Sequence, residues 1–293
     1  MMFPSLRLLP SLLLFWPVLF LTQTACLART PPTGPKAFGR IHYPADQLAN
    51  LRQGSFEIIV TLNFDPARVP KTAYTAPMSF FLLSDHGGPS GKPRELMHFR
   101  SMTTYRARRE EGQLLTELLG EGDAVAALAL GGRMVNRSLR IPARQHGLKK
   151  GATVHLGFTW TYEDGAYRCA VYLNGTRLRE QLGGGVAPFR YGADAAIWIG
   201  SPHYRSAYGT LHALRFSSVA RSPEAFRAAG ENRRFEADEA TLYIEDFRSL
   251  DSAKTGPQPL GRGGRLDGAY LIHETGDGRR AVQLNAYDEE DPL

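Results

Sequence analysis

GATVHLGFTWTYEDGAYRCAVYLNGTRLREQL, residues 151–182, holds the strongest structural signal in this chain. Apolar side chains occupy every second position of its first part: Val154, Leu156, Phe158 and Trp160. This two-residue period is typical of a β-strand with one face in a core. His155, Gly157 and Thr159 lie between the apolar positions, so the pattern predicts a second face exposed to water.

The same stretch predicts two further strands. A polar turn, residues 162–165, separates the first strand from a second alternating run: Tyr167, Cys169, Val171 and Leu173. Asn174 and Gly175 follow at once, and these two residue types readily adopt the positive φ angles of a tight hairpin turn. The chain is therefore expected to turn back into a third antiparallel strand.

Two segments of the sequence also resemble a known family. HLGFTWTYEDGAYRCAVYLNGTRL, residues 155–178, resembles a signature of laminin-G-like domains in the concanavalin A-like lectin and glucanase superfamily. IWIGSPHYRSAYGTLHALRFSSVARSPEAF, residues 197–226, is similar to a second signature in the expected order. The resemblance implies an all-β fold, a two-sheet antiparallel jelly-roll sandwich with one short helix. It leaves the function open, because this fold hosts lectins, hydrolases, lyases and adhesion modules.

Composition agrees with one large folded domain. The chain has 293 residues, of which 43% are hydrophobic and 22% charged, well outside the range of disordered chains. We expect a signal peptide at residues 1–28, a linker at 29–36, the sandwich at 37–250, and a C-terminal loop and hairpin extension at 251–293. The formal net charge is +6, but the arginines are scattered and no nucleic-acid-binding motif accompanies them. Nucleic acid is therefore not an expected partner.

The first residues have the features of a secretory leader. A single charge, Arg7, precedes an apolar run that is interrupted by prolines and too short to span a bilayer. Cleavage before Arg29 predicts a secreted or periplasmic protein. The alternative is lipidation of Cys26, which would anchor the protein in the cell envelope and bring it to a membrane. Either outcome removes Cys26 as a disulfide partner, so Cys169 is predicted to be a small buried side chain.

Several other elements follow from local signals. Residues 56–64 alternate as a strand, 38–43 suggest an edge strand, and glycine spacing favours a strand at 124–130. Ser222 and Pro223 predict the start of a helix over residues 223–229 that Gly230 ends. Three expectations concern the C-terminal part: a strand at 241–247 beside an N-terminal strand, a loop at 251–266, and a terminal hairpin turning at 276–278.

One loop, residues 201–208, is the predicted ligand site. It joins two strands at the rim of the sandwich and carries aromatic rings for sugar stacking and an arginine for hydroxyl groups: His203, Tyr204, Arg205 and Tyr208. The alternative is that these side chains pack on neighbouring loops. Relatives often bind calcium at the rim, and Asp85 is a candidate ligand here. Calcium takes about six to eight oxygens, so a simple turn role for Asp85 competes with this prediction.

No catalytic residue is predicted. Glycoside hydrolysis needs two carboxyl groups, about 5 Å apart in retaining enzymes. The acidic motif that hydrolases of this fold carry on one strand is absent, and His212 and Ala213 occupy positions where relatives often have acids. Glu245 and Asp246 are adjacent, so a strand would direct them to opposite faces. The histidines also lack the spacing of a zinc site.

These observations lead to three functional hypotheses. The first is a secreted, non-enzymatic laminin-G-like module that binds carbohydrate at the cell surface or outside the cell, in the manner of a lectin. The second is an adhesion or assembly module whose partner is a cell-surface protein. The third is a diverged glycoside hydrolase or polysaccharide lyase on the same fold. No cofactor is expected, apart from calcium if Asp85 contributes to a site.

Overall fold

The structure is a computed structural model, and all the residues that it describes belong to one compact unit within 32–293. The described ranges are 39–45, 52–62, 78–85, 94–101, 124–130, 133–141, 147–184, 195–199, 209–254, 256–276 and 278–284. Within these ranges, no helix combines the length and apolar character needed to cross a membrane.

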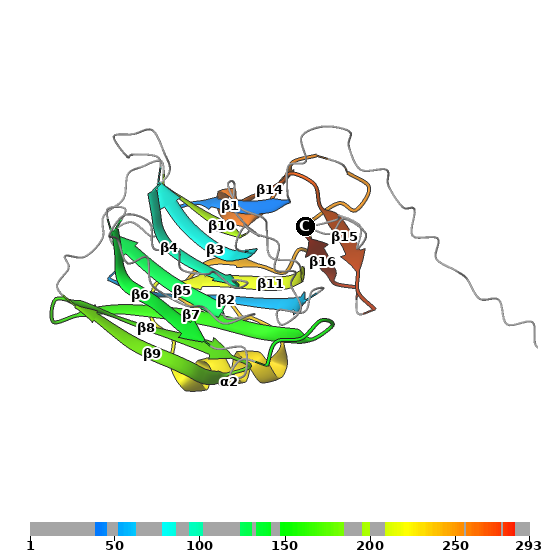
Figure 1. Cartoon of the computed structure of the whole chain (residues 1–293). Coiled ribbons are helices and arrows are strands. Elements are labelled where there is room, and N and C mark those ends of the chain that lie inside the picture. The colour runs from blue at the N-terminus through cyan, green and yellow to red at the C-terminus, as the bar shows by residue number, and fades with distance from the viewer. Residues whose placement is uncertain are drawn as a thin grey trace, which may run out of the picture. The chain divides into compact units, whose positions relative to one another are not determined.

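Two antiparallel sheets face each other across one core (Figure 1). The first sheet has the strand order β13 (Gln258–Pro259), β14 (Arg265–Asp267), β1 (Arg40–Pro44), β10 (Ala196–Ile199), β3 (Met78–Asp85), β4 (Arg94–Ser101), β5 (Ala124–Leu130) and β6 (Arg133–Ile141). The second has the order β15 (Leu271–Glu274), β16 (Arg280–Gln283), β11 (Gly209–Ser217), β2 (Gln53–Leu62), β7 (Thr153–Glu163), β8 (Ala166–Leu173) and β9 (Thr176–Gly184), and β12 (Thr241–Glu245) also pairs with β11. The predicted all-β sandwich is confirmed.

Aromatic side chains from both sheets interlock in the core. Phe81 of the first sheet stacks on Phe56 of the second, with ring centroids 4.7 Å apart, and Phe216 contacts both rings. The alternate positions of β7 and β8 point inward as predicted, and Cys169 is buried among them. Burial of so many large apolar side chains is the main driving force for this arrangement.

The two predicted hairpins are present. Asn174 and Gly175 have φ angles of 48° and 77°, the left-handed pair that a two-residue turn between twisted strands requires. Asp164 and Gly165 form a second such turn, with φ angles of 50° and 76°. This turn is tighter than the expected four-residue turn, because β7 continues through Glu163.

The outer face of the second sheet is covered, which the alternation in β7 did not predict. His155 is only 2% exposed and Thr159 only 7%, although both lie on the face directed away from the core. The helix α2 (Pro223–Asn232) lies against this face, as Figure 1 shows below β8. Phe226 of α2 stacks on Tyr172 with ring centroids 4.1 Å apart. The prediction that this face is exposed to water is therefore wrong, because a segment distant in sequence packs on it.

The helix α2 begins where the sequence predicts but ends later. Ser222 caps it by accepting a hydrogen bond from the Ala225 amide, and it continues through Gly230 to Asn232. Gly230 does not stop the helix; it allows close packing instead. A Cβ at this position would lie 3.0 Å from the Asn174 carbonyl carbon, a tight contact, so glycine favours the close approach of the helix to the β8–β9 turn.

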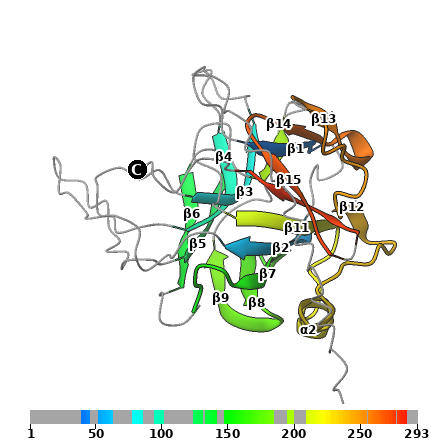
Figure 2. The ribbon, with the colours of Figure 1, turned by 90° about the vertical axis from the view of Figure 1, so that its right-hand side faces the viewer.

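The C-terminal residues contribute strands to both sheets (Figure 2). Residues 251–266, expected to be a loop, contain β13, the 3₁₀ turn η2 (Gly261–Gly263) and the start of β14. The terminal hairpin β15–β16 forms as predicted, and β16 pairs with β11.

Two predicted strand neighbours are wrong. The strand β12 pairs with β11 rather than with an N-terminal strand. The strand β1 lies between β14 and β10 rather than at an edge. Both errors have the same cause, since strand pairing over long sequence separations leaves little trace in local sequence patterns.

Candidate functional site

Most of the predicted site lies outside the described residues. This holds for His203, Tyr204, Arg205 and Tyr208, and for Cys26. Asp85 is the last residue of β3 and pairs across the sheet with Arg94, so it belongs to a strand rather than to the expected turn. In the part of the chain that the structure describes, no group of three or more His, Cys, Asp or Glu residues is arranged to hold a metal ion.

A buried ion cluster fixes the segment after β11 to the outer face of the second sheet. The Glu57 carboxylate is fully buried and accepts hydrogen bonds from Arg215, with Nε 2.8 Å and a terminal nitrogen 2.7 Å from Oε2. His155 Nε2 lies 3.1 Å from the other carboxylate oxygen. A carboxylate buried this deeply needs such compensation, because desolvation of a lone charge is very costly.

The cluster continues toward the surface through a second arginine. Arg221 donates to both carboxylate oxygens of Asp238, at 2.7 and 2.8 Å, and to Ser217 Oγ at 2.8 Å. The Arg221 guanidinium holds the pKa of the Asp238 carboxyl well below its usual range. Arg215 also donates to the Glu236 carbonyl at 3.1 Å. These contacts anchor the chain on both sides of α2, and Glu57 and His155 are buried beneath it.

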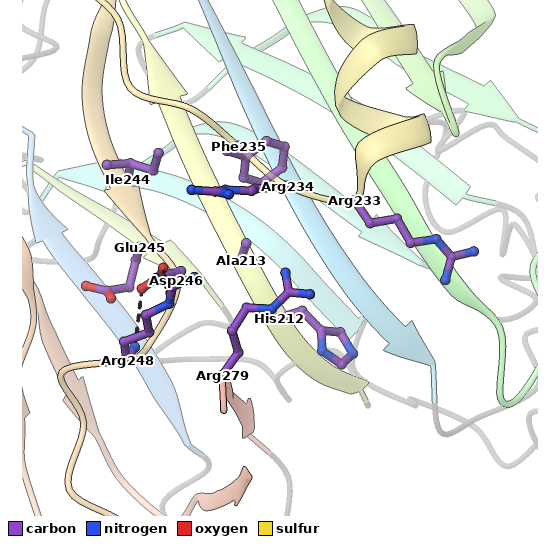
Figure 3. A pocket seen from close by; sticks show the side chains of 10 residues that line it. All are labelled: His212, Ala213, Arg233, Arg234, Phe235, Ile244, Glu245, Asp246, Arg248 and Arg279. Atoms are coloured by element: carbon purple, nitrogen blue, oxygen red, sulfur yellow. Dashed lines mark hydrogen bonds and ion pairs between the residues drawn. The ribbon is translucent and has the colours of Figure 1, made fainter. Parts of the chain in front are cut away.

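Beside this anchor, the outer face of the second sheet is hollowed (Figure 3). The hollow has a volume of about 210 Å³. Its walls come from four separate parts of the chain: β11, the segment after α2, the end of β12, and the β15–β16 turn. The lining residues are His212, Ala213, Arg233, Arg234, Phe235, Ile244, Glu245, Asp246, Arg248 and Arg279.

Phe235 holds one wall of the hollow in place. Its side chain is only 7% exposed and packs with Ile59, Ala213 and Ile244. The Arg215 guanidinium lies 4.9 Å from the centre of its ring, a cation–π contact that ties this apolar cluster to the buried ion cluster. Because Phe235 is fixed, the backbone of Arg233 and Arg234 is held at the edge of the hollow.

The two acidic residues of the hollow face different surroundings. Asp246 forms an ion pair with Arg248 at 2.9 Å, and both side chains are about half exposed. Glu245 is buried, and its carboxylate accepts hydrogen bonds from the backbone amides of Phe247 at 2.8 Å and Gly261 at 3.3 Å. Burial raises the pKa of Glu245. In Figure 3 its carboxylate points away from His212 and Arg279, as strand alternation requires.

Sequence reasoning did not identify this site. Arg233 and Arg234 follow a helix whose end was expected earlier, and Arg279 lies in the turn of the terminal hairpin. The run Arg233-Arg234-Phe235 and the pair Arg279-Arg280 were the available signals, but nothing local indicates that they converge. His212 is half-buried and contacts the Thr61 hydroxyl at 2.7 Å, so it forms part of the hollow's edge.

Comparisons with known proteins give distant structural similarities only. No family model matches the chain, and no curated protein does. Its structure is similar to a heptameric SAP-like pentraxin from Limulus polyphemus, with 12% identity, a TM-score of 0.45, and coverage of 82% of this chain and 92% of the other. It is also similar to the CBM40 of a Ruminococcus gnavus IT-sialidase bound to sialyllactose, with 14% identity, a TM-score of 0.42, and coverage of 67% and 96%. Membership of the laminin-G-like family stays a prediction.

Proposed function

We propose that the protein is a non-enzymatic carbohydrate-binding module and that the hollow on the second sheet is its binding site. The observation that supports this most directly is the mixture of groups in the hollow. Guanidinium groups donate hydrogen bonds to sugar hydroxyls, the Asp246 carboxylate accepts them, and Ala213 and Ile244 offer an apolar surface. A few polar groups around an apolar patch are the usual composition of a small-ligand site.

The geometry supports binding more than hydrolysis. Cleavage of a glycosidic bond needs two carboxyl groups that face the same sugar. Of the two acids that line the hollow, Asp246 is about half exposed but engaged by Arg248, whereas the Glu245 carboxylate is buried and held by backbone amides. A diverged hydrolase or lyase is therefore the weaker proposal.

A glycan array tests the proposed function. The mature protein is applied with calcium and, in parallel, with a chelator. Retention of at least one class of glycan in both conditions is expected, because the lining residues can bind sugar without a metal ion. Lack of retention in both conditions would contradict the proposal, and capture of an envelope protein instead would favour the adhesion hypothesis. Release of smaller sugars from a retained polysaccharide would revive the enzymatic alternative.

We also propose that the module acts outside the cytoplasm after removal of residues 1–28, and that it is a laminin-G-like domain. The leader-like N-terminus and the two sequence signatures support these statements. Mass spectrometry of the mature N-terminus is expected to find Arg29 first. A diacylglyceryl group on Cys26 would instead show that the module is anchored to a membrane.

A further inference from the structure

We infer that the hollow selects acidic saccharides, and that Arg234 and Arg279 bind the carboxylate or sulfate group of the sugar. This inference rests on the proposed carbohydrate-binding function and adds a ligand class to it. In Figure 3 Arg234 and Arg279 approach the hollow from opposite sides, one from the segment after α2 and the other from the β15–β16 turn.

The hollow carries positive charge on Arg233 and Arg234. Two acidic residues also line it. One acid, Asp246, is matched by Arg248, and the other, Glu245, is buried with its carboxylate on backbone amides. Among the residues that the structure describes, Arg233 and Arg234 contact no acidic side chain, and both are exposed. An anionic group would therefore enter a site that carries excess positive charge, on a chain with a net charge of +6.

The backbone that carries Arg233 and Arg234 is also held in position before a ligand arrives. Arg233 ends α2 in a left-handed conformation, with a φ angle of 49°, and Phe235 is buried directly after Arg234. The Arg221–Asp238 ion pair and the bond from Arg215 to Glu236 fix the chain on the far side. Prior ordering lowers the entropic cost of binding. A guanidinium can also bind a planar carboxylate through two parallel hydrogen bonds.

The size of the hollow favours a sugar over a larger anion. Its volume of about 210 Å³ is below the roughly 300–1,000 Å³ of pockets for drug-sized ligands. A single acidic sugar unit fits such a space, whereas the backbone of a nucleic acid needs an extended basic groove. We therefore expect the hollow to bind one acidic unit of a glycan chain.

Binding measurements on matched oligosaccharides test the inference. The probes are a uronic acid oligosaccharide, its carboxyl-reduced neutral form, and a sulfated oligosaccharide, each titrated into the full mature protein. We expect binding of an acidic probe to exceed that of the neutral form by about tenfold or more, because charge-assisted hydrogen bonds are stronger than neutral ones. Preference for the carboxylated or for the sulfated probe supports the inference and identifies the anion.

Two variants assign the effect to the named residues. The double variant R234Q/R279Q is expected to lose about tenfold or more in affinity for the acidic probe while keeping its affinity for the neutral form. The control K149Q/R227Q removes the same number of charges from exposed positions that do not line the hollow, and its affinity should be unchanged. If R234Q/R279Q fails to give the wild-type circular dichroism spectrum, R234Q alone is used, since its side chain is exposed.

The outcomes separate failure of this inference from failure of the proposed function. Equal binding of the acidic and neutral probes would overturn the acidic preference but leave carbohydrate binding intact. Absence of binding to every probe would overturn both. Equal losses in R234Q/R279Q and in the control, or equally strong binding of duplex DNA, would show only general attraction to a basic protein and would also overturn the inference.

Discussion

Glu57 is the buried charge that joins the second sheet to its outer covering. Its carboxylate accepts hydrogen bonds from two residues on other strands, Arg215 and His155. All three side chains are at most 7% exposed. Replacement of one partner in such a cluster leaves the remaining charges buried and poorly paired, which costs more than the pair itself contributes. The energetic importance of this residue follows from burial, and not from the number of its contacts.

We predict that Glu57→Gln lowers the free energy of unfolding by about 3–5 kcal/mol. Glutamine has the same shape but carries no charge. When its one carbonyl oxygen accepts from Arg215, its amide nitrogen faces His155, so the buried guanidinium loses its counter-charge. Chemical denaturation followed by circular dichroism measures the change. Glu180→Gln serves as the control, because Glu180 pairs with Arg168 and Arg177 at the surface, where a change of at most about 1 kcal/mol is expected. Similar losses in the two variants would refute this account of Glu57.

At the scale of elements, the packing of α2 on the β8–β9 hairpin depends on two glycines. Gly230 lies in the helix, and its backbone contacts the hairpin turn. Gly175 lies in the hairpin turn, and its backbone contacts the helix. A Cβ on Gly175 would lie 2.4 Å from the Arg227 Cα, a separation that no rotamer change can relieve. The helix and the hairpin are therefore in contact through their main chains.

We predict that Gly175→Ala destabilises the protein by about 1–3 kcal/mol more than Gly165→Ala does. Both positions have nearly the same φ angle, 77° and 76°, so both variants incur a similar left-handed strain of about 1–2 kcal/mol. Gly165 has open space around its missing side chain, and only Gly175 faces the helix. Thermal unfolding of the two variants measures the difference. Equal destabilisation would mean that the helix moves aside without cost.

The sequence predicts the elements of this fold better than it predicts their surroundings. The strands β2, β7 and β8 and the turn at Asn174-Gly175 can be predicted from residues that are close together in the sequence. Their local patterns are therefore sufficient to locate them. The cover over His155 could not be predicted in this way, because Phe226 and Phe235 come from more than 60 positions further along the chain. The hollow escaped prediction for the same reason, since its arginines belong to three separate elements.

At the scale of the whole molecule, both sheets depend on the C-terminal residues. The strand β14 extends the first sheet beside β1, and β16 extends the second beside β11. Leu266 and Val282, one from each of these strands, are fully buried in the shared core. The residues after 250 are therefore integral to the packing of the described sandwich.

We predict that a chain ending at residue 254 loses cooperative unfolding. It lacks β13 to β16, so it loses the buried Leu266 and Val282 and leaves backbone groups at one edge of β1 and of β11 unpaired. A chain ending at residue 284 keeps every described strand and should melt as the full chain does. Differential scanning calorimetry of the two truncated proteins distinguishes these cases. A cooperative transition at an unchanged temperature in the shorter protein would show that residues 255–293 form a separable appendage.

The pairing of β1 with β14 has a consequence for the order of events during biosynthesis. Arg40 and Asp267 hydrogen-bond at 3.3 Å although they are 227 positions apart in the chain. Contacts over such separations form slowly, and here they await synthesis of the residues around position 267. Neither sheet can be completed before β14 and β16 have left the ribosome, so chaperones that recognise extended nascent chains can bind while the intervening residues are made.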